Sequence, residues 1–150
     1  MKLINLKITT PERVVLEERV SQLSVMTGAG EITILPDHIP LITVLSPGIA
    51  RAIKEDGQEI TMAISGGFLE LSNNYLTILA DTAERAEEID LERAEQARRK
   101  AEELKQEARR NMDEEQFAVV ASQLEKNLAR IRAAKRFRMR TKELPNFEDK

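Results

Sequence analysis

The chain has 150 residues, of which 41% are hydrophobic and 3% aromatic, so it can form one average domain or two small ones but not a large multi-site enzyme. Its net charge of −3 disfavours a globally basic nucleic-acid binder. It contains no cysteine and a single histidine, which excludes disulfides, thiolate nucleophiles and histidine-rich metal sites.

The N-terminal residues and the apolar runs predict neither export nor membrane insertion. No run approaches the roughly 20 apolar residues that span a bilayer. Asn5 and Lys7 interrupt the start of the chain, where a signal peptide would be continuously apolar. We therefore expect a soluble chain without a transmembrane segment.

Residues 1–83 have the pattern of short β-strands. They contain all six glycines, and apolar residues alternate with polar ones in residues 4–8, 23–26, 49–53 and 60–64. Turn-forming sequences separate these segments at residues 10–11, 28–30, 46–48, 55–57 and 73–74. Roughly eight to ten strands of this kind indicate an antiparallel sandwich or barrel.

The remaining residues predict two helices, which makes the fold class α+β with domains at residues 1–86 and 87–150. The apolar face of the first helix follows Asp90 as N-cap and comprises Leu91, Ala94, Ala97, Ala101, Leu104 and Ala108. The second face follows a capping box of Asp113 and Gln116 and comprises Phe117, Val120, Ala121, Leu124, Leu128 and Ile131. The short break at residues 111–112 makes the helices antiparallel neighbours, and Pro145 ends the second one.

The seam of the first helix is poor in large apolar side chains, with only Leu91 and Leu104. At roughly 2 to 3 kcal/mol for each buried large side chain, such a seam contributes only a few kcal/mol. This predicts a hairpin that a ligand or partner can release from a permanent strand body.

Catalytic motifs are missing from the sequence. Neither a Walker sequence nor a Gly-x-Gly-x-x-Gly fingerprint occurs. Ser65 in the run Ser65-Gly66-Gly67 resembles a nucleophile elbow, but the first glycine is absent and His38 is the single candidate base. A tight strand bend explains this run better, and we expect neither a catalytic nor a metal site.

Residues 130–142 form an unpaired basic arm. Its charges are all cationic: Arg130, Arg132, Lys135, Arg136, Arg138, Arg140 and Lys142. A solvated tail is one interpretation, and docking onto an acidic protein surface is another. Nucleic acid is the third, and it is disfavoured because Phe137 is the one aromatic residue among the cations.

A second set of cations lies on the predicted hairpin. Arg93 and Lys100 share a face of the first helix, and Lys126 and Arg130 share a face of the second. In a closed hairpin these four side chains could converge on a polyphosphate. A salt-bridged surface is the simpler interpretation.

Four segments, in order along the strand half, carry a family resemblance. They are residues 30–41 (GEITILPDHIPL), 47–48 (PG), 65–70 (SGGFLE) and 79–86 (LADTAERA), and residues 89–94 (IDLERA) match the pattern Ile/Leu-Asp-x-x-Arg-Ala. Together they resemble the epsilon subunits of bacterial F-type ATP synthases. Thr33 departs from the glycine that is usual in that family, which predicts a local change in its strand.

The resemblance implies a non-catalytic rotor subunit on the cytoplasmic face of the bacterial plasma membrane. Its sandwich of about ten strands would hold the gamma subunit and seat on the ring of c subunits through Glu31 and His38. Its extended hairpin would bring the arm to an acidic segment of a catalytic beta subunit and stop ATP hydrolysis, through Arg130, Arg132, Lys135, Arg136, Arg138 and Arg140. No nucleic-acid partner and no required cofactor are expected.

Some bacterial members bind ATP on the folded hairpin, so the resemblance also implies a regulatory ATP site. Its residues here are Glu84, Ile89, Asp90, Arg93, Ala94, Lys100, Lys126 and Arg130. Lys100 and Lys126 stand where ATP-binding relatives have arginine, and lysine lacks the planar fork for phosphate oxygens, so we expect weakened binding. An alignment shifted by one residue would bring in Arg99 instead. The alternative to a rotor subunit is a stand-alone sandwich and hairpin module that binds an acidic protein or nucleic acid.

Overall fold

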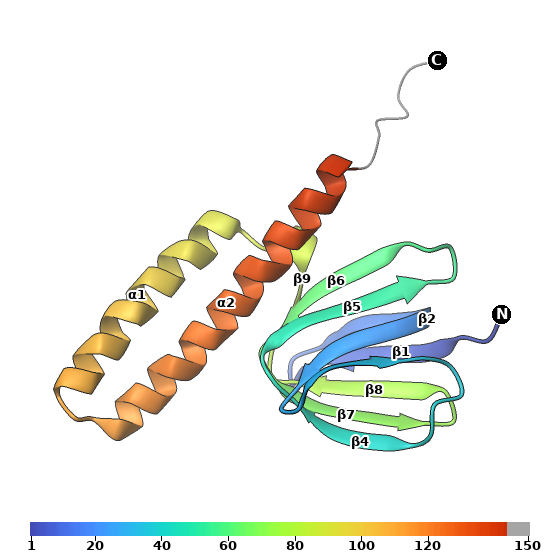
Figure 1. Cartoon of the computed structure of the whole chain (residues 1–150), viewed down its shortest axis with the longest axis horizontal. Coiled ribbons are helices and arrows are strands. Elements are labelled where there is room, and N and C mark those ends of the chain that lie inside the picture. Colours follow the sequence, from blue (N-terminus) through green and yellow to red (C-terminus); the bar gives the residue numbers. More distant parts are fainter. Residues whose placement is uncertain (144–150) are drawn as a thin grey trace, which may run out of the picture.

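The computed structural model describes residues 1–143, and Pro145, the expected helix stop, lies outside them. The strand half contains β1 (Ile4–Thr9), β2 (Val14–Thr27), β3 (Gly30–Ile34), β4 (Leu41–Leu45), β5 (Gly48–Lys54), β6 (Glu59–Ile64), β7 (Gly67–Ser72), β8 (Tyr75–Ala80) and β9 (Ala83–Arg85). A short 3-10 turn, η1 (Ala86–Glu88), leads to helices α1 (Leu91–Arg110) and α2 (Glu114–Glu143). Figure 1 shows this order along the chain, with α2 between α1 and the strands.

The strands form a β-sandwich, which confirms the predicted α+β class. The hydrogen-bonded order is β1-β8-β7-β4-β2-β5-β6-β9, with β3 on β2 and an additional β1–β2 pairing. The β1–β8 pair is parallel and the other pairs are antiparallel. The described part has nine strands where about ten were expected, and β2 alone runs continuously through 14 residues.

Strand β2 joins the two layers of the sandwich. Its first half pairs with β1, from Val14 to Val20, and its second half pairs with β3 and β5. The register with β5 shifts between Val20 and Gln22, and such a bulge bends a strand and increases its twist. One strand therefore contributes inward-facing side chains to both layers.

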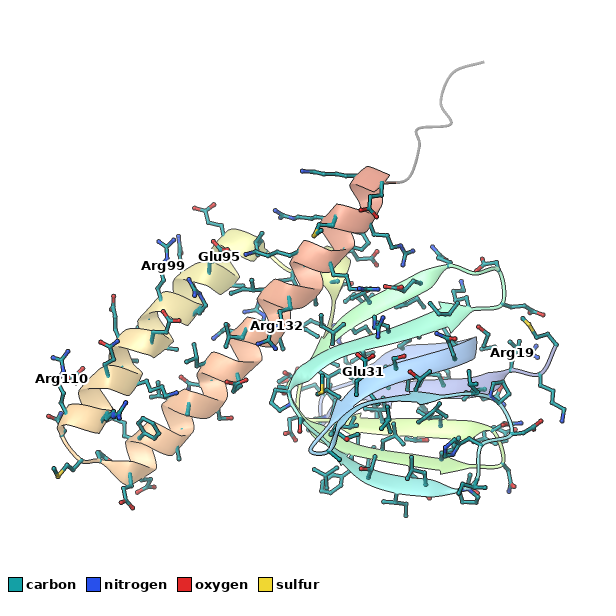
Figure 2. All side chains as sticks on the ribbon, viewed as in Figure 1. Arg19, Glu31, Glu95, Arg99, Arg110 and Arg132 are labelled. Atoms are coloured by element: carbon teal, nitrogen blue, oxygen red, sulfur yellow. The ribbon has the colours of Figure 1, made fainter. Side chains whose placement is uncertain are left out.

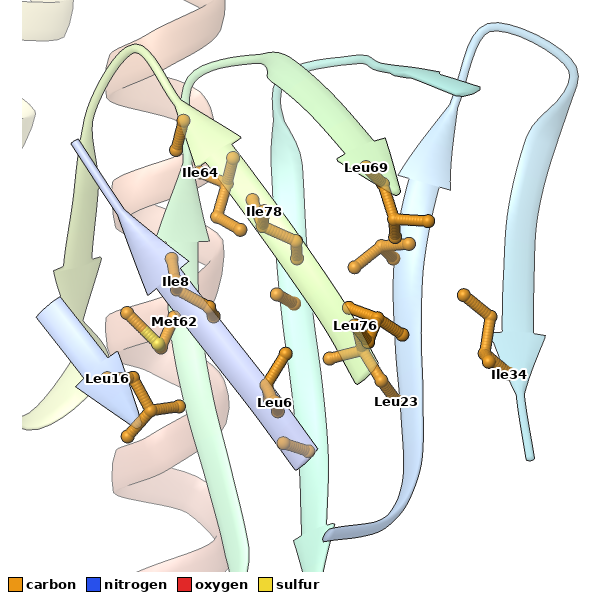
Figure 3. Packing of buried hydrophobic residues seen from close by; sticks show 14 of the residues in the cluster. Leu6, Ile8, Leu16, Leu23, Ile34, Met62, Ile64, Leu69, Leu76 and Ile78 are labelled. Atoms are coloured by element: carbon orange, nitrogen blue, oxygen red, sulfur yellow. The ribbon is translucent and has the colours of Figure 1, made fainter. Parts of the chain in front are cut away.

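The main core lies inside the strand half. Alternation in β1 buries Ile4, Leu6 and Ile8 and leaves Asn5 and Lys7 exposed, as the period-two pattern predicts. Figure 3 shows how side chains from separate strands meet there, and the cluster runs from Ile4 to Ala83. Its largest fully buried members are Ile4, Leu6, Ile8, Leu23, Ile34, Met62, Leu69, Leu71, Leu76 and Ile78.

The unusual residue of the family-like segment leaves β3 regular. Thr33 lies opposite Ser24 on β2, and the two hydroxyl oxygens are 2.7 Å apart. A Thr–Ser pair across neighbouring strands stabilises a sheet modestly. The expected local change is therefore a cross-strand hydrogen bond rather than a break in the strand.

The helices begin at the predicted caps. The Asp90 carboxylate accepts a hydrogen bond from the backbone N–H of Arg93, and that of Asp113 accepts one from Gln116. On α1 the deeply buried residues are Ala94, Ala101 and Ala108. Small side chains let α1 and α2 approach closely, but they bury little apolar area. The structure thus agrees with a thin seam on α1.

The hairpin rests on the strands through α2, which packs against β5, β6 and η1. A second apolar cluster forms this joint and includes Ala63 of β6, Ile89 and Ile131. Of its seven buried members, only Ile89 and Ile131 are larger than alanine. The joint is therefore far less apolar than the sandwich core.

Candidate functional site

A groove of about 460 Å³ lies between the two helices. Lys100 of α1 and Lys126 and Arg130 of α2 line it, together with Ala97 and Asn127. Arg99 points to the outer side of α1, away from α2 (Figure 2). The antiparallel hairpin thus brings three of the four proposed phosphate-binding cations to one groove.

Arg130 is already engaged by the sandwich. Its Nε donates to the Glu84 carboxylate of β9 at 2.6 Å, and its Nη1 donates to the Asn127 side chain at 3.2 Å. The Arg130 side chain is 20% exposed, so this is a partly shielded pair. A phosphate in the groove would compete with Glu84 for the guanidinium.

The other residues of the expected ATP site form the start of α1. Ile89 and Ala94 are buried in the joint against Ile131. Asp90 caps the helix through the Arg93 backbone N–H at 3.1 Å, while the Arg93 side chain is exposed and does not line the groove. None of these four residues lines the cationic groove, and their contacts stabilise the helix end and the joint.

The basic arm is largely paired, which corrects the expectation of an unpaired arm. Arg136 contacts Glu59 of β6 through Nε at 3.2 Å and Nη2 at 3.4 Å, and Arg140 reaches the same carboxylate at 3.3 Å. Lys135 lies 3.6 Å from Glu95 of α1. The reason is the tertiary arrangement: closure of the hairpin brings Glu95 to the arm, and docking of α2 on the strands brings Glu59 to it.

Three cations of the arm remain solvated, and Lys142 at its end is one of them, exposed and in no ion pair within residues 1–143. Arg132 and Arg138 are exposed and form no ion pair within residues 1–143. Figure 2 shows Arg132 on α2. These side chains are thus available to an acidic surface without any rearrangement of the hairpin.

Glu59 is the most shielded carboxylate among these pairs, with 13% of its side chain exposed. Burial raises the pKa of Glu59, but hydrogen bonds from Arg136 and Thr61 and the charges of Arg136 and Arg140 outweigh burial and hold the pKa below its usual 4.5. Glu59 is therefore ionised at neutral pH, and its negative charge faces Arg136 and Arg140 of the arm.

The two expected ring-contact residues lie on the strand half. Glu31 of β3 is exposed, and its carboxylate lies 2.5 Å from Arg51 of β5. His38 is exposed in the loop between β3 and β4, with its Nδ1 2.7 Å from the Ile39 carbonyl oxygen. Neither side chain is held in the core, so both can contact a partner.

An exposed apolar patch, which the sequence interpretation missed, covers the outer face of β4, β7 and β8. It consists of Ile42, Val44, Phe68 and Leu79, which are 55 to 75% exposed. Val44 pairs with Phe68 and Phe68 with Leu79, so these side chains form one row across the sheet. The signal was present in residues 41–45, where apolar residues occupy both faces of a strand that alternation would make polar outside.

The run around Ser65 is a strand bend and not an elbow, as predicted. Gly66 and Gly67 have φ of 127° and 135°, and the Ser65 hydroxyl accepts a hydrogen bond from the Thr82 backbone. Within residues 1–143, no helix is long and apolar enough to cross a membrane. That part of the chain also holds no cluster of three or more metal-ligating side chains.

A strand body that carries a docked helical hairpin, an exposed apolar patch and a basic arm is typical of the class of proteins that bind other proteins in an assembly. Residues 3–86 match the family described as ATP synthase, Delta/Epsilon chain, beta-sandwich domain. The chain belongs to this ATP synthase epsilon chain family, and it is a non-catalytic subunit of that synthase.

Relatives and a solved structure agree over most of the chain. It is 48% identical over 132 residues to the ATP synthase epsilon chain of Herpetosiphon aurantiacus, which covers 88% of this chain and 94% of that one. It is 42% identical over 134 residues to that of Moorella thermoacetica, with 89% and 98% covered. The fold is also similar to a chain of the Euglena gracilis mitochondrial ATP synthase, in a structure of OSCP, F1 and c-ring, with a TM-score of 0.72, 29% identity, and 82% and 76% covered.

Proposed function

We propose that the chain is the central-stalk rotor subunit that couples the catalytic head to the membrane rotor ring through the gamma subunit. In this proposal the subunit acts on the cytoplasmic face of the bacterial plasma membrane. It inhibits ATP hydrolysis when the hairpin leaves the sandwich and extends. The observation that carries the inhibition is the joint itself, which is small, alanine-rich and supported by ion pairs of the arm.

The exposed patch on β4, β7 and β8 is the surface we assign to the gamma subunit. A contiguous apolar strip on a strand body favours a protein partner, because its burial releases water from apolar surface. Val44→Ser combined with Phe68→Ser should weaken association with gamma. Val119→Ser, at an equally exposed position on α2, is the control and should leave association unchanged. Equal binding by both variants would rule out this surface.

The contact with the rotor ring is assigned to Glu31 and His38. Glu31→Ala with His38→Ala should keep gamma binding and weaken the coupling of ion flow to synthesis in membranes. Because Glu31 also pairs with Arg51, the single variant Arg51→Ala separates the loss of that pair from the loss of a ring contact. Unchanged coupling in the double variant would remove these residues from the interface.

Inhibition is assigned to the arm and its acidic partner on a catalytic beta subunit. Neutralisation of Arg132, Arg136 and Arg140 together should raise hydrolysis when the chain is added to a catalytic head that lacks its own epsilon subunit. Arg132→Gln alone should give part of that rise, because Arg132 makes no ion pair within residues 1–143. Arg99→Gln, an exposed cation on the outer side of α1, should have no effect.

The regulatory ATP site is assigned to the groove between the helices. Lys100, Lys126 and Arg130 would face the phosphates, and bound ATP would stabilise the docked hairpin by about 2.7 kcal/mol at a hundredfold excess over Kd. Calorimetry with millimolar ATP is the test. Heat should fall with Lys100→Gln and Lys126→Gln and with Asp90→Ala and Arg93→Ala, but not with Arg99→Gln. Absence of heat in the unmodified chain would reject the site.

A further inference from the structure

Glu59 occupies a particular place among the ion pairs of residues 1–143, because two arginines share it. Arg136 approaches through two nitrogens and Arg140 through one, and these arginines are one helical turn apart on α2. Thr61 on the same strand also donates a hydrogen bond to Glu59 at 2.9 Å. We refer to Glu59, Arg136 and Arg140 as the Glu59 latch.

The latch joins parts of the chain that only the docked hairpin brings together. Glu59 begins β6 and Arg136 follows 77 residues later on α2. Arg136 and Arg140 are 42% and 37% exposed, whereas Glu59 is 13% exposed. The Glu59 carboxylate is therefore largely buried at the surface of the sandwich, and the more exposed side chains of Arg136 and Arg140 contact it from the solvent side.

Charges around the latch make Glu59 necessary for it. The cavity at this junction is lined by Glu18, Lys54, Arg85 and Glu87 in addition to Glu59 and Arg140. Two acids and two bases balance there, so Glu59 supplies the net negative charge that faces the two arginines. Without Glu59, the two arginines would repel one another and face a junction whose remaining charges cancel.

We propose that Glu59 is the internal competitor of the external acidic partner for Arg136 and Arg140, and that it thereby sets the fraction of subunits with a released hairpin. This inference rests on the proposed inhibition by the arm. Glu59 is fixed on β6, so an arm that extends away from the sandwich to an acidic segment of another subunit has to give up Glu59. Release from Glu59 is therefore a step that precedes or accompanies contact with the partner, whereas Arg132 and Arg138 are free to make the first contact.

The test measures hairpin release in the isolated full-length chain, without any partner. The chain has no cysteine, so Glu12→Cys on the turn after β1 and Ser122→Cys on α2 provide a unique pair of label sites, both exposed. The distance between spin labels at these two sites distinguishes the docked hairpin from the released one. It is measured at urea concentrations too low to unfold the sandwich. Glu59→Gln should raise the ratio of released to docked hairpin about fivefold.

Glu55→Gln is the matched control, because it removes one exposed acid from the adjacent turn that has no ion pair within residues 1–143. It should leave the ratio unchanged. The double variant Arg136→Gln with Arg140→Gln leaves β6 untouched and should release the hairpin as much as Glu59→Gln does. Combination of all three changes should add little further, since each removes the same contact. Equal ratios for Glu59→Gln and Glu55→Gln, or simple additivity of the two sets of changes, would overturn the latch.

A second measurement separates the latch from the proposed function. Added to a catalytic head without its epsilon subunit, Glu59→Gln should lower ATP hydrolysis more than Glu55→Gln, because more hairpins are released while the arm keeps its charges. Greater release in the isolated chain without greater inhibition would overturn both the competition with a partner and the proposed inhibition by the arm. Glu59 would then be shown only to hold the hairpin on the sandwich.

Discussion

Gly67 is the residue whose backbone the sandwich constrains most closely. Its φ of 135° lies in a region that L side chains rarely adopt, and a Cβ there would come within 2.1 Å of the Leu79 carbonyl oxygen. The close approach belongs to the β7–β8 ladder, where Gly67 pairs with Ala80. A backbone neighbour cannot move aside as a flexible side chain would.

We therefore expect Gly67→Ala to destabilise the chain by at least about 2 kcal/mol, through both strain and overlap. Gly28→Ala is the control, because no atom lies within 4 Å of a Cβ at that position. It should change stability by less than about 1 kcal/mol. Urea denaturation followed by circular dichroism measures both, and equal stability of the two variants would contradict this account.

Glu59 makes docking of the hairpin depend on pH. Its pKa is lower in the folded protein than its usual 4.5, so its contribution to stability is complete above that value and is lost as the pH falls through the folded pKa. Release of the hairpin should increase on acidification from about pH 4.5. The same labelled chain with Glu59→Gln should lack this component, and identical pH profiles would show that another acid controls docking.

At the scale of the elements, the hairpin is held by few large side chains. Val120, Leu124 and Ala101 form one small cluster within the hairpin, and Ile131 with Ile89 forms the joint to the strands. The charges of the arm supplement this limited apolar area. Helix α2 is thus the element through which any signal from the hairpin reaches the sandwich.

Ile131→Ala should cost about 2 to 4 kcal/mol of hairpin docking, because it removes one of the two large side chains that are fully buried at the joint. Val119→Ala removes an apolar side chain that is 55% exposed on the same helix and should be nearly neutral. Limited proteolysis of α1 and α2 measures the difference. Cleavage at the same rate in both variants would mean that the ion pairs, and not the joint, hold the hairpin.

In the whole molecule, the strand half buries its main apolar cluster with its own residues, whereas the joint of the hairpin is buried by residues of both halves. The main cluster draws all of its buried residues from Ile4 to Ala83, whereas the joint needs residues of both halves. The sandwich therefore has the composition of an independent folding unit. The hairpin can leave it without disrupting that cluster.

A chain ending after Ala86 should accordingly keep the strand fold, with cooperative thermal unfolding and an unchanged far-ultraviolet β signal. It should also fail to inhibit hydrolysis by a catalytic head without its epsilon subunit, because it lacks the arm. Loss of cooperative unfolding would show that the sandwich depends on α2. Retained inhibition would assign that activity to the strand half.

Local sequence patterns were sufficient to predict the strands and helices, because alternation, turns and helix caps depend on residues that are neighbours in the sequence. Ile4, Leu6 and Ile8 face the core as their period predicts, and Asp90 and Asp113 cap the helices as predicted. The glycine pair at the start of β7 was likewise identified as a bend. The motifs of residues 30–41 and 79–86 were also enough to indicate the family.

Contacts between distant residues were decided only by the tertiary structure. Sequence spacing placed Arg136 and Arg140 on one helical face but carried no information that Glu59 would meet them, because helix α2 first has to pack on β6. The apolar row from Val44 to Leu79 likewise exists only through strand pairing. Local sequence patterns predict which residues form strands, helices and caps, whereas the docking of α2 sets which charges pair within residues 1–143 and which stay exposed.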